Sequence, residues 1–145
     1  MVATDGSEFA GRAIKHGVNL AKALGAKLTA VTMSEPFHWF DANMVEGAET
    51  AYLDGANQAA GMALGVVVEA AREAGLPCET VHIKGAHPYE AIIGTARERK
   101  CDLIVMASHG RRGLSAVVLG SETVKVLTHS TIRFWCVIEN EDHPP

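Results

Sequence analysis

Several residue patterns that mark large classes of proteins are absent from this chain. It has 3 cysteines among 145 residues, and Cys78, Cys101 and Cys136 form no C-x-x-C pair. An odd number of widely spaced thiols does not build a disulfide framework or a cysteine-rich zinc site. The 7 histidines include no H-x-x-x-H pair. We therefore expect reduced cysteines packed in or beside the core, and no structural zinc.

Long hydrophobic runs and an excess of positive charge are also missing. No window approaches the ~18 consecutive apolar residues of a membrane span, and no basic segment followed by an apolar stretch opens the chain. Lys and Arg number 13 against 17 Asp and Glu, a net charge of −4. Nucleic-acid binders usually carry a basic face, and only Arg111 and Arg112 offer a local basic patch here. The composition predicts a soluble, cytoplasmic protein that binds neither membranes nor nucleic acid.

What is present is the composition of an ordinary globular protein, 48% hydrophobic and 21% charged. We expect one domain over residues 1–145, with a tail at 139–145. Strands are expected at residues 2–3, 27–33, 79–83, 103–106 and 132–138, and helices at 7–24, 51–74, 88–99 and 121–129. This alternation predicts an α/β fold, a doubly wound, five-stranded parallel sheet with right-handed crossovers and helices on both faces.

A glycine-rich connection follows the apolar run at residues 102–106. Ala107, Ser108, His109 and Gly110 are followed, after nine intervening residues, by Gly120 and Ser121. Glycines and hydroxyls between a buried strand and a helix let backbone N–H groups close on phosphate oxygens. The spacing is neither G-x-x-x-x-G-K-[ST] nor G-x-G-x-x-G. It predicts a different kind of phosphate-binding loop, which is longer than most βα connections.

This pattern resembles the nucleotide-binding loop of the universal stress protein family. Other segments resemble the family in order along the chain: residues 4–7 its opening motif, 28–36 its second strand, 101–107 its fourth strand and 126–132 its closing segment. The resemblance implies the strand order 3-2-1-4-5, in which the order reverses between the first and fourth strands. Ligands of such sheets bind at that reversal, beside Asp5 and the glycine loop.

The resemblance further implies an adenine nucleotide, ATP, ADP or AMP, as cofactor of a regulatory protein in stress response. Backbone at Met33 would meet the adenine, Ala3, Thr4 and Asp5 would line the base and ribose, and Met106 and Ala107 would close over the sugar. The phosphates would rest on backbone N–H groups of His109, Gly110, Gly120, Ser121, Glu122 and Thr123, with the Ser121 and Thr123 hydroxyls adding hydrogen bonds. Asp5 would hold Mg²⁺ indirectly, through the phosphates. A homodimer through the last strand is also implied.

Several of these residues have a second interpretation. Asp5 and Glu8 form a D-x-x-E pair that can cap the first helix. His109 is typical of a turn, and Gly110 and Gly113 of a long connection. No residue is placed to act on a γ-phosphate or to orient water, so we expect binding without efficient turnover. The alternatives are a slow ATPase and a family member that has lost nucleotide binding and acts as a dimeric interaction protein.

Three departures from the family pattern modify these expectations. Ala107 replaces a frequent glycine, a mild change. Glu122 replaces an apolar residue and would repel an anion, which predicts weaker triphosphate binding or a preference for AMP or ADP. The two ends of the chain also differ from the family pattern. The first strand is short, as if the N-terminus were clipped, and polar and aromatic residues at 133–136 replace an apolar run. Trp135 is either an interface anchor or part of the core.

Overall fold

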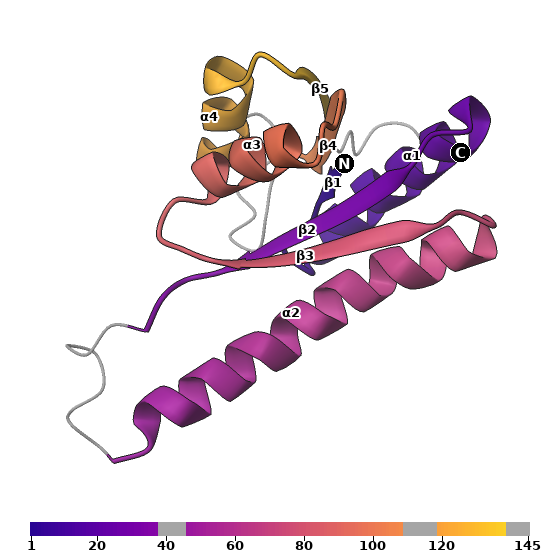
Figure 1. Cartoon of the computed structure of the whole chain (residues 1–145). Coiled ribbons are helices and arrows are strands. Elements are labelled where there is room, and N and C mark those ends of the chain that lie inside the picture. The colour runs from indigo at the N-terminus through magenta and orange to yellow at the C-terminus, as the bar shows by residue number, and fades with distance from the viewer. Residues whose placement is uncertain (38–45, 109–118, 139–145) are drawn as a thin grey trace.

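A five-stranded parallel sheet lies at the centre of the structure, in the order β3-β2-β1-β4-β5 (Figure 1). This confirms the expected fold class and strand order. The computed structural model describes residues 1–37, 46–108 and 119–138. Its strands are β1 (Val2–Ala3), β2 (Leu28–Ser34), β3 (Cys78–Lys84), β4 (Leu103–Ala107) and β5 (Arg133–Val137). Its helices are α1 (Glu8–Leu24), α2 (Ala48–Glu73), α3 (Pro88–Glu98) and α4 (Ser121–His129).

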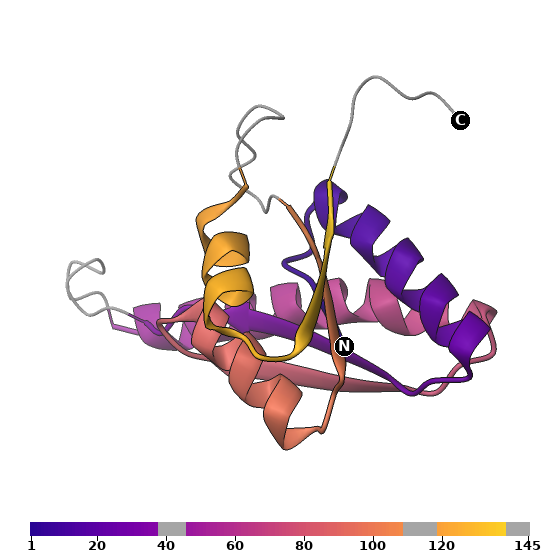
Figure 2. The same cartoon turned by 90° about the horizontal axis from the view of Figure 1, so that it is seen from above.

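The helices cover both faces of the sheet, α1 and α2 on one and α3 and α4 on the other (Figure 2). Each strand contributes side chains to the hydrophobic cores on both faces of the sheet, because successive side chains of a strand point to opposite faces. Val105 packs with α1 and α2, whereas its neighbour Ile104 packs with α3 and α4. In the same way, Val2 and Ala30 lie in the core beneath α1 and α2, whereas Ala3 and Val31 lie in the core beneath α3 and α4.

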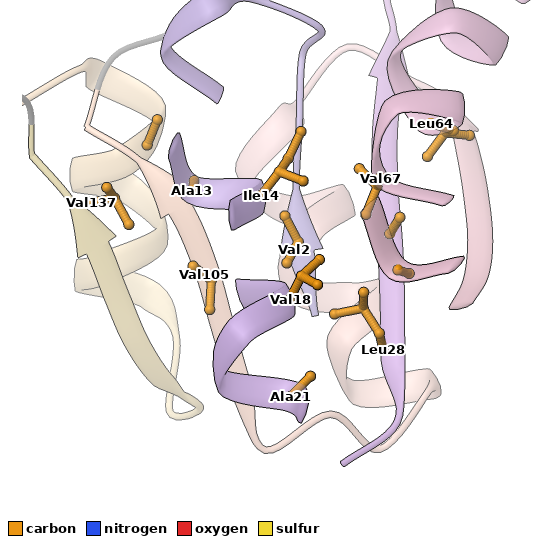
Figure 3. Packing of buried hydrophobic residues seen from close by; sticks show 13 residues of the cluster. Val2, Ala13, Ile14, Val18, Ala21, Leu28, Leu64, Val67, Val105 and Val137 are labelled. Carbon is orange, nitrogen blue, oxygen red and sulfur yellow. The ribbon is translucent and has the colours of Figure 1, made fainter. Parts of the chain in front are cut away.

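The central strand β1 is short, as expected, but it is hydrogen-bonded on both sides. Val2 pairs with Ala30 of β2 and with Val105 of β4. Val105 N also donates to Met1 O at 2.8 Å, which carries the ladder to the first residue. Val2 is completely buried and lies between α1 and α2 in the cluster of Figure 3. The position of the residues after β1 therefore depends on tight packing around Val2.

Several element bounds differ from their sequence-based expectation by one to three residues. Helix α2 begins at Ala48, three residues earlier than expected, and its N-cap is Gly47, which has a positive φ and gives no side-chain cap. Strand β3 gains a residue at each end because it pairs residue for residue with β2, from Leu28 opposite Cys78 to Ser34 opposite Lys84. The three cysteines are half-buried free thiols, and burial raises the pKa of Cys78 and Cys136.

Candidate functional site

The turn after β1 is fixed by its own polar side chains. Thr4 N donates to Val31 O of β2 at 2.9 Å, and the Thr4 hydroxyl accepts from Gly6 N. The Asp5 carboxylate accepts from Ser7 N at 3.0 Å. Gly6 has φ +75°, a conformation that favours glycine. These contacts hold Thr4 and Asp5 at the carboxyl end of the central strand.

The expected capping role of Asp5 is wrong. Ser7 is the N-cap of α1, and its hydroxyl accepts from Ala10 N at 3.3 Å. Glu8 is consequently the first helical residue, where a D-x-x-E cap would have needed it in the third position. Asp5 instead lies two residues before the cap, in the turn that leads from the sheet to α1.

The N-terminus of α4 is held against the carboxyl end of β4. Gly120 N donates to Ser108 O at 2.8 Å, while Ser108 N donates to Val137 O of β5. The buried Thr123 hydroxyl lies 3.2 Å from Ala107 O and 3.3 Å from Ser108 O, and donates its hydrogen to this pair of carbonyls. The Gly120 amide and the Thr123 hydroxyl, both expected to meet phosphate, thus make intramolecular bonds that position the helix.

Three amides at the start of α4 remain suited to an anion. The first helical bond of α4 runs from Val124 N to Gly120 O, so Ser121, Glu122 and Thr123 precede any acceptor within the helix. Gly120 supplies no side-chain cap. The partial positive charge of a helix N-terminus therefore lies at the carboxyl edge of the sheet, next to the end of β4.

The Glu122 carboxylate is turned toward α3. One of its oxygens accepts from Tyr89 N, in the first turn of α3, at 3.0 Å, and the other lies 2.7 Å from Lys125 Nζ. The hydrogen bond with Glu122 raises the pKa of Lys125. The Lys125 ammonium in turn lies 5.5 Å from the centre of the Tyr89 ring, and the His129 ring packs on that ring as well. The negative charge expected to repel phosphate is thus partly compensated by the N-terminus of α3 and an ammonium group.

Substitutions of Glu122 can distinguish its hydrogen bond with Tyr89, which stabilises the fold, from its negative charge, which acts on a bound phosphate. Glu122→Val removes the acceptor of Tyr89 N, so we expect a loss of about 1 kcal/mol of unfolding free energy. Glu122→Gln keeps an acceptor oxygen and should lose less. Both changes remove one negative charge beside the α4 amides, so both should bind ATP more tightly than the unchanged chain. Denaturant unfolding and ATP titration measure the two effects, and equal ATP affinity in all three proteins would contradict the electrostatic role.

The remaining predicted site residues lie along the same edge. Ala3 ends β1, Met106 and Ala107 end β4, and Met33 is the penultimate residue of β2, on the other side of β1. His109 and Gly110 lie outside the described residues. No group of three or more His, Cys, Asp and Glu side chains able to hold a metal occurs in residues 1–37, 46–108 and 119–138.

Tyr89 and Lys125 were not predicted from the sequence as part of this site. Lys125 stands three residues after Glu122, a spacing at which side chains of a helix contact each other. This ion pair could therefore have been predicted from the sequence. The hydrogen bond between Tyr89 and Glu122 joins residues that are 33 positions apart in the chain. Nothing in the local sequence indicated it, apart from Pro88, which marks the start of α3.

These features define an open α/β protein with an acidic turn and a helix N-terminus flanking the point where its strand order reverses. Residues 1–137 match the model of the Universal stress protein family, and the chain belongs to this family. It is 31% identical to Universal stress protein MJ0531 of Methanocaldococcus jannaschii over 132 residues, 90% of this chain and 75% of that protein.

Two solved structures extend the comparison. The hypothetical protein MJ0577 has the same fold, with a TM-score of 0.78 and 23% identity over 97% of this chain and 96% of that one. A universal stress protein in complex with cAMP is 28% identical, with a TM-score of 0.67 over 94% of this chain and 93% of that one. Among the described helices of the present chain, none has the length and apolar character needed to cross a membrane.

Proposed function

We propose that this chain is a regulatory protein of stress response that binds an adenine nucleotide, ATP, ADP or AMP, at the carboxyl ends of β1 and β4. The observation that carries this proposal is the α4 N-terminus, fixed to the end of β4 by Gly120 and Thr123 and presenting the amides of residues 121–123. Helix N-termini of this kind favour phosphate. The cAMP bound to a family member that is 28% identical supports the same ligand class.

Each part of the nucleotide has a place along this edge. The adenine lies at the Met33 backbone, the ribose between the end of β1 and residues 106–107, and the phosphates at the start of α4. The Asp5 carboxylate faces a ribose hydroxyl or a Mg²⁺ ion carried by the phosphates. Gly120 and Thr123 position the helix, and His109 and Gly110, which the resemblance also assigns to the phosphates, lie outside the described residues.

The bound ligand can be identified directly. The protein is purified without added nucleotide and extracted with acid, the extract is analysed by mass spectrometry, and melting is compared with ATP, ADP, AMP and adenosine. We expect an adenine nucleotide in the extract and a higher melting temperature with the phosphorylated ligands. An empty extract together with unchanged melting would favour the dimeric interaction protein. Metal-dependent phosphate release that Asp5→Ala abolishes in a folded protein would instead indicate a slow ATPase.

The exposed edge of β5 favours self-association. Arg133 and Trp135 are exposed on this edge strand, Trp135 to 38%, and the centre of its ring lies 5.6 Å from that of the His16 ring. An exposed strand edge offers free backbone groups to a second chain, and we propose a homodimer through β5. Light scattering at micromolar concentration should give the mass of a dimer. A monomer in that measurement would contradict the proposal.

A further inference from the structure

Helix α2 carries an exposed face that contributes nothing to the cores described above. Its inner side buries Ala60, Ala63, Leu64, Val67 and Ala71. On its outer side, Met62 is 64% exposed, Val66 55% and Val68 39%. In Figure 1 the helix runs along the bottom of the molecule, and no other described element lies beyond it. Large apolar side chains thus gather on a helix that is already packed on its opposite side.

Two glycines lie on the same outer face. A Cβ added at Gly61 or Gly65 would meet no atom within 4 Å, so packing within the described part of the chain does not require glycine at either position. Glycine inside a helix is destabilising relative to alanine. Because glycine has no side chain, the backbone of another helix can approach α2 closely at these two positions.

The outer face has a regular and symmetric pattern. Asp54, Gln58, Gly61, Gly65, Val68 and Arg72, called here the α2 seam, alternate at intervals of four and three residues, and all are exposed. This is the spacing of the contact line between two packed helices. The seam is also symmetric about the level of Ala63. Asp54 and Arg72 each lie nine residues from that level, Gln58 and Val68 five, and Gly61 and Gly65 two.

We propose that the α2 seam pairs with the α2 seam of a second copy of this chain, with the two helices antiparallel and related by a two-fold axis. In this arrangement Gly61 faces the partner copy's Gly65 at the closest approach of the helices. Gln58 faces Val68, and the exposed Met62, one residue after Gly61, flanks the contact. Asp54 faces Arg72 at both ends of the seam, because in a two-fold interface every contact occurs twice.

Charge complementarity favours a second copy over an unrelated partner. Arg72 already contacts Glu69 at 2.5 Å on its own helix, and Asp54 of the other copy would complete a group of three charges. A parallel pairing in register would instead place Asp54 against Asp54 and Arg72 against Arg72. The surface is separate from the β5 edge, so the two contacts can form independently.

Glycine variants test the close approach. Gly65→Gln places a long side chain on the seam, while Gly55→Gln makes the same change on the same helix outside it. A Cβ at either position meets open space, so both variants should fold and melt at or above the temperature of the unchanged chain. In sedimentation velocity from 5 to 200 µM, about a 40-fold concentration range, the unchanged chain and Gly55→Gln should associate through the seam. Gly65→Gln should weaken this association at least ~10-fold.

Charge exchange tests the direction of pairing. Asp54→Arg and Arg72→Asp should each weaken the association, and the double variant should restore it to within ~3-fold of the unchanged chain. If Gly65→Gln weakens association no more than Gly55→Gln does, the association belongs to another surface, such as β5, and the proposal is overturned. An unchanged chain that shows no association beyond a β5 dimer would also overturn it, as would a double variant no better than its single variants.

Discussion

Ser121→Asp is expected to weaken ATP binding by about 10- to 100-fold while leaving the protein folded and at least as stable. Ser121 is exposed at the first position of α4, so the substitution disturbs no packing. A carboxylate there favours the helix itself, because it lies at the positive end of the helix dipole. The same negative charge occupies the place assigned to the phosphates and repels them. Stability and affinity should therefore change in opposite directions.

The controls isolate charge from shape. Ser121→Asn has nearly the size of the aspartate without its charge, so it should lose only a small part of the affinity. Adenosine carries no phosphate and should bind all three proteins alike. Isothermal titration measures the affinities, and thermal unfolding without ligand measures stability. If Ser121→Asp binds ATP as well as Ser121→Asn does, the phosphates do not lie at the start of α4.

The second large effect concerns Gly17, on the inner face of α1. A Cβ at this position would overlap Cγ2 of the completely buried Val2. Val2 is β-branched and held between the two neighbouring strands, so it has little room to move. We expect Gly17→Ala to lower the free energy of unfolding by about 1–3 kcal/mol, although alanine favours a helix. Because Thr4 and Asp5 follow β1 directly, nucleotide affinity should fall as well.

Gly11 provides the matched control on the same helix. It is exposed, and a Cβ there meets nothing within 4 Å. Gly11→Ala should therefore stabilise the protein by about 0.5–1 kcal/mol through helix propensity alone. Denaturant unfolding of both variants measures the difference. A Gly17→Ala protein as stable as Gly11→Ala would show that Val2 and β1 shift without cost.

Most of the fold could be predicted from the sequence because its signals are local. The helix α4 was expected with its correct bounds, since Gly120 and Ser121 mark its start and apolar spacing its course. The start of α2 could not be predicted, because Gly47 gives no capping signal. The ends of β3 are set by its pairing with β2, which lies about fifty residues earlier in the chain.

The candidate site divides in the same way. Its segments could be found because glycines, hydroxyls and an aspartate follow buried strands. The roles within those segments depended on contacts between distant residues. The Gly120 amide and the Thr123 hydroxyl bond to the end of β4, and the Glu122 carboxylate bonds to Tyr89 of α3. The motif did not suggest these structural roles. Local sequence does not encode such contacts.

The most direct test of the central claim is a titration of ¹⁵N-labelled protein with ADP, followed through the backbone amide signals. We expect saturable shifts at Ser121, Glu122 and Thr123 in α4, together with Thr4 and Asp5 after β1, and no comparable shifts along the outer face of α2. Adenosine should shift the signals at β1 and β2 and leave those of α4 almost unchanged. Saturable ADP binding that leaves the amides of residues 121–123 unshifted would contradict the assignment of this edge as a phosphate site.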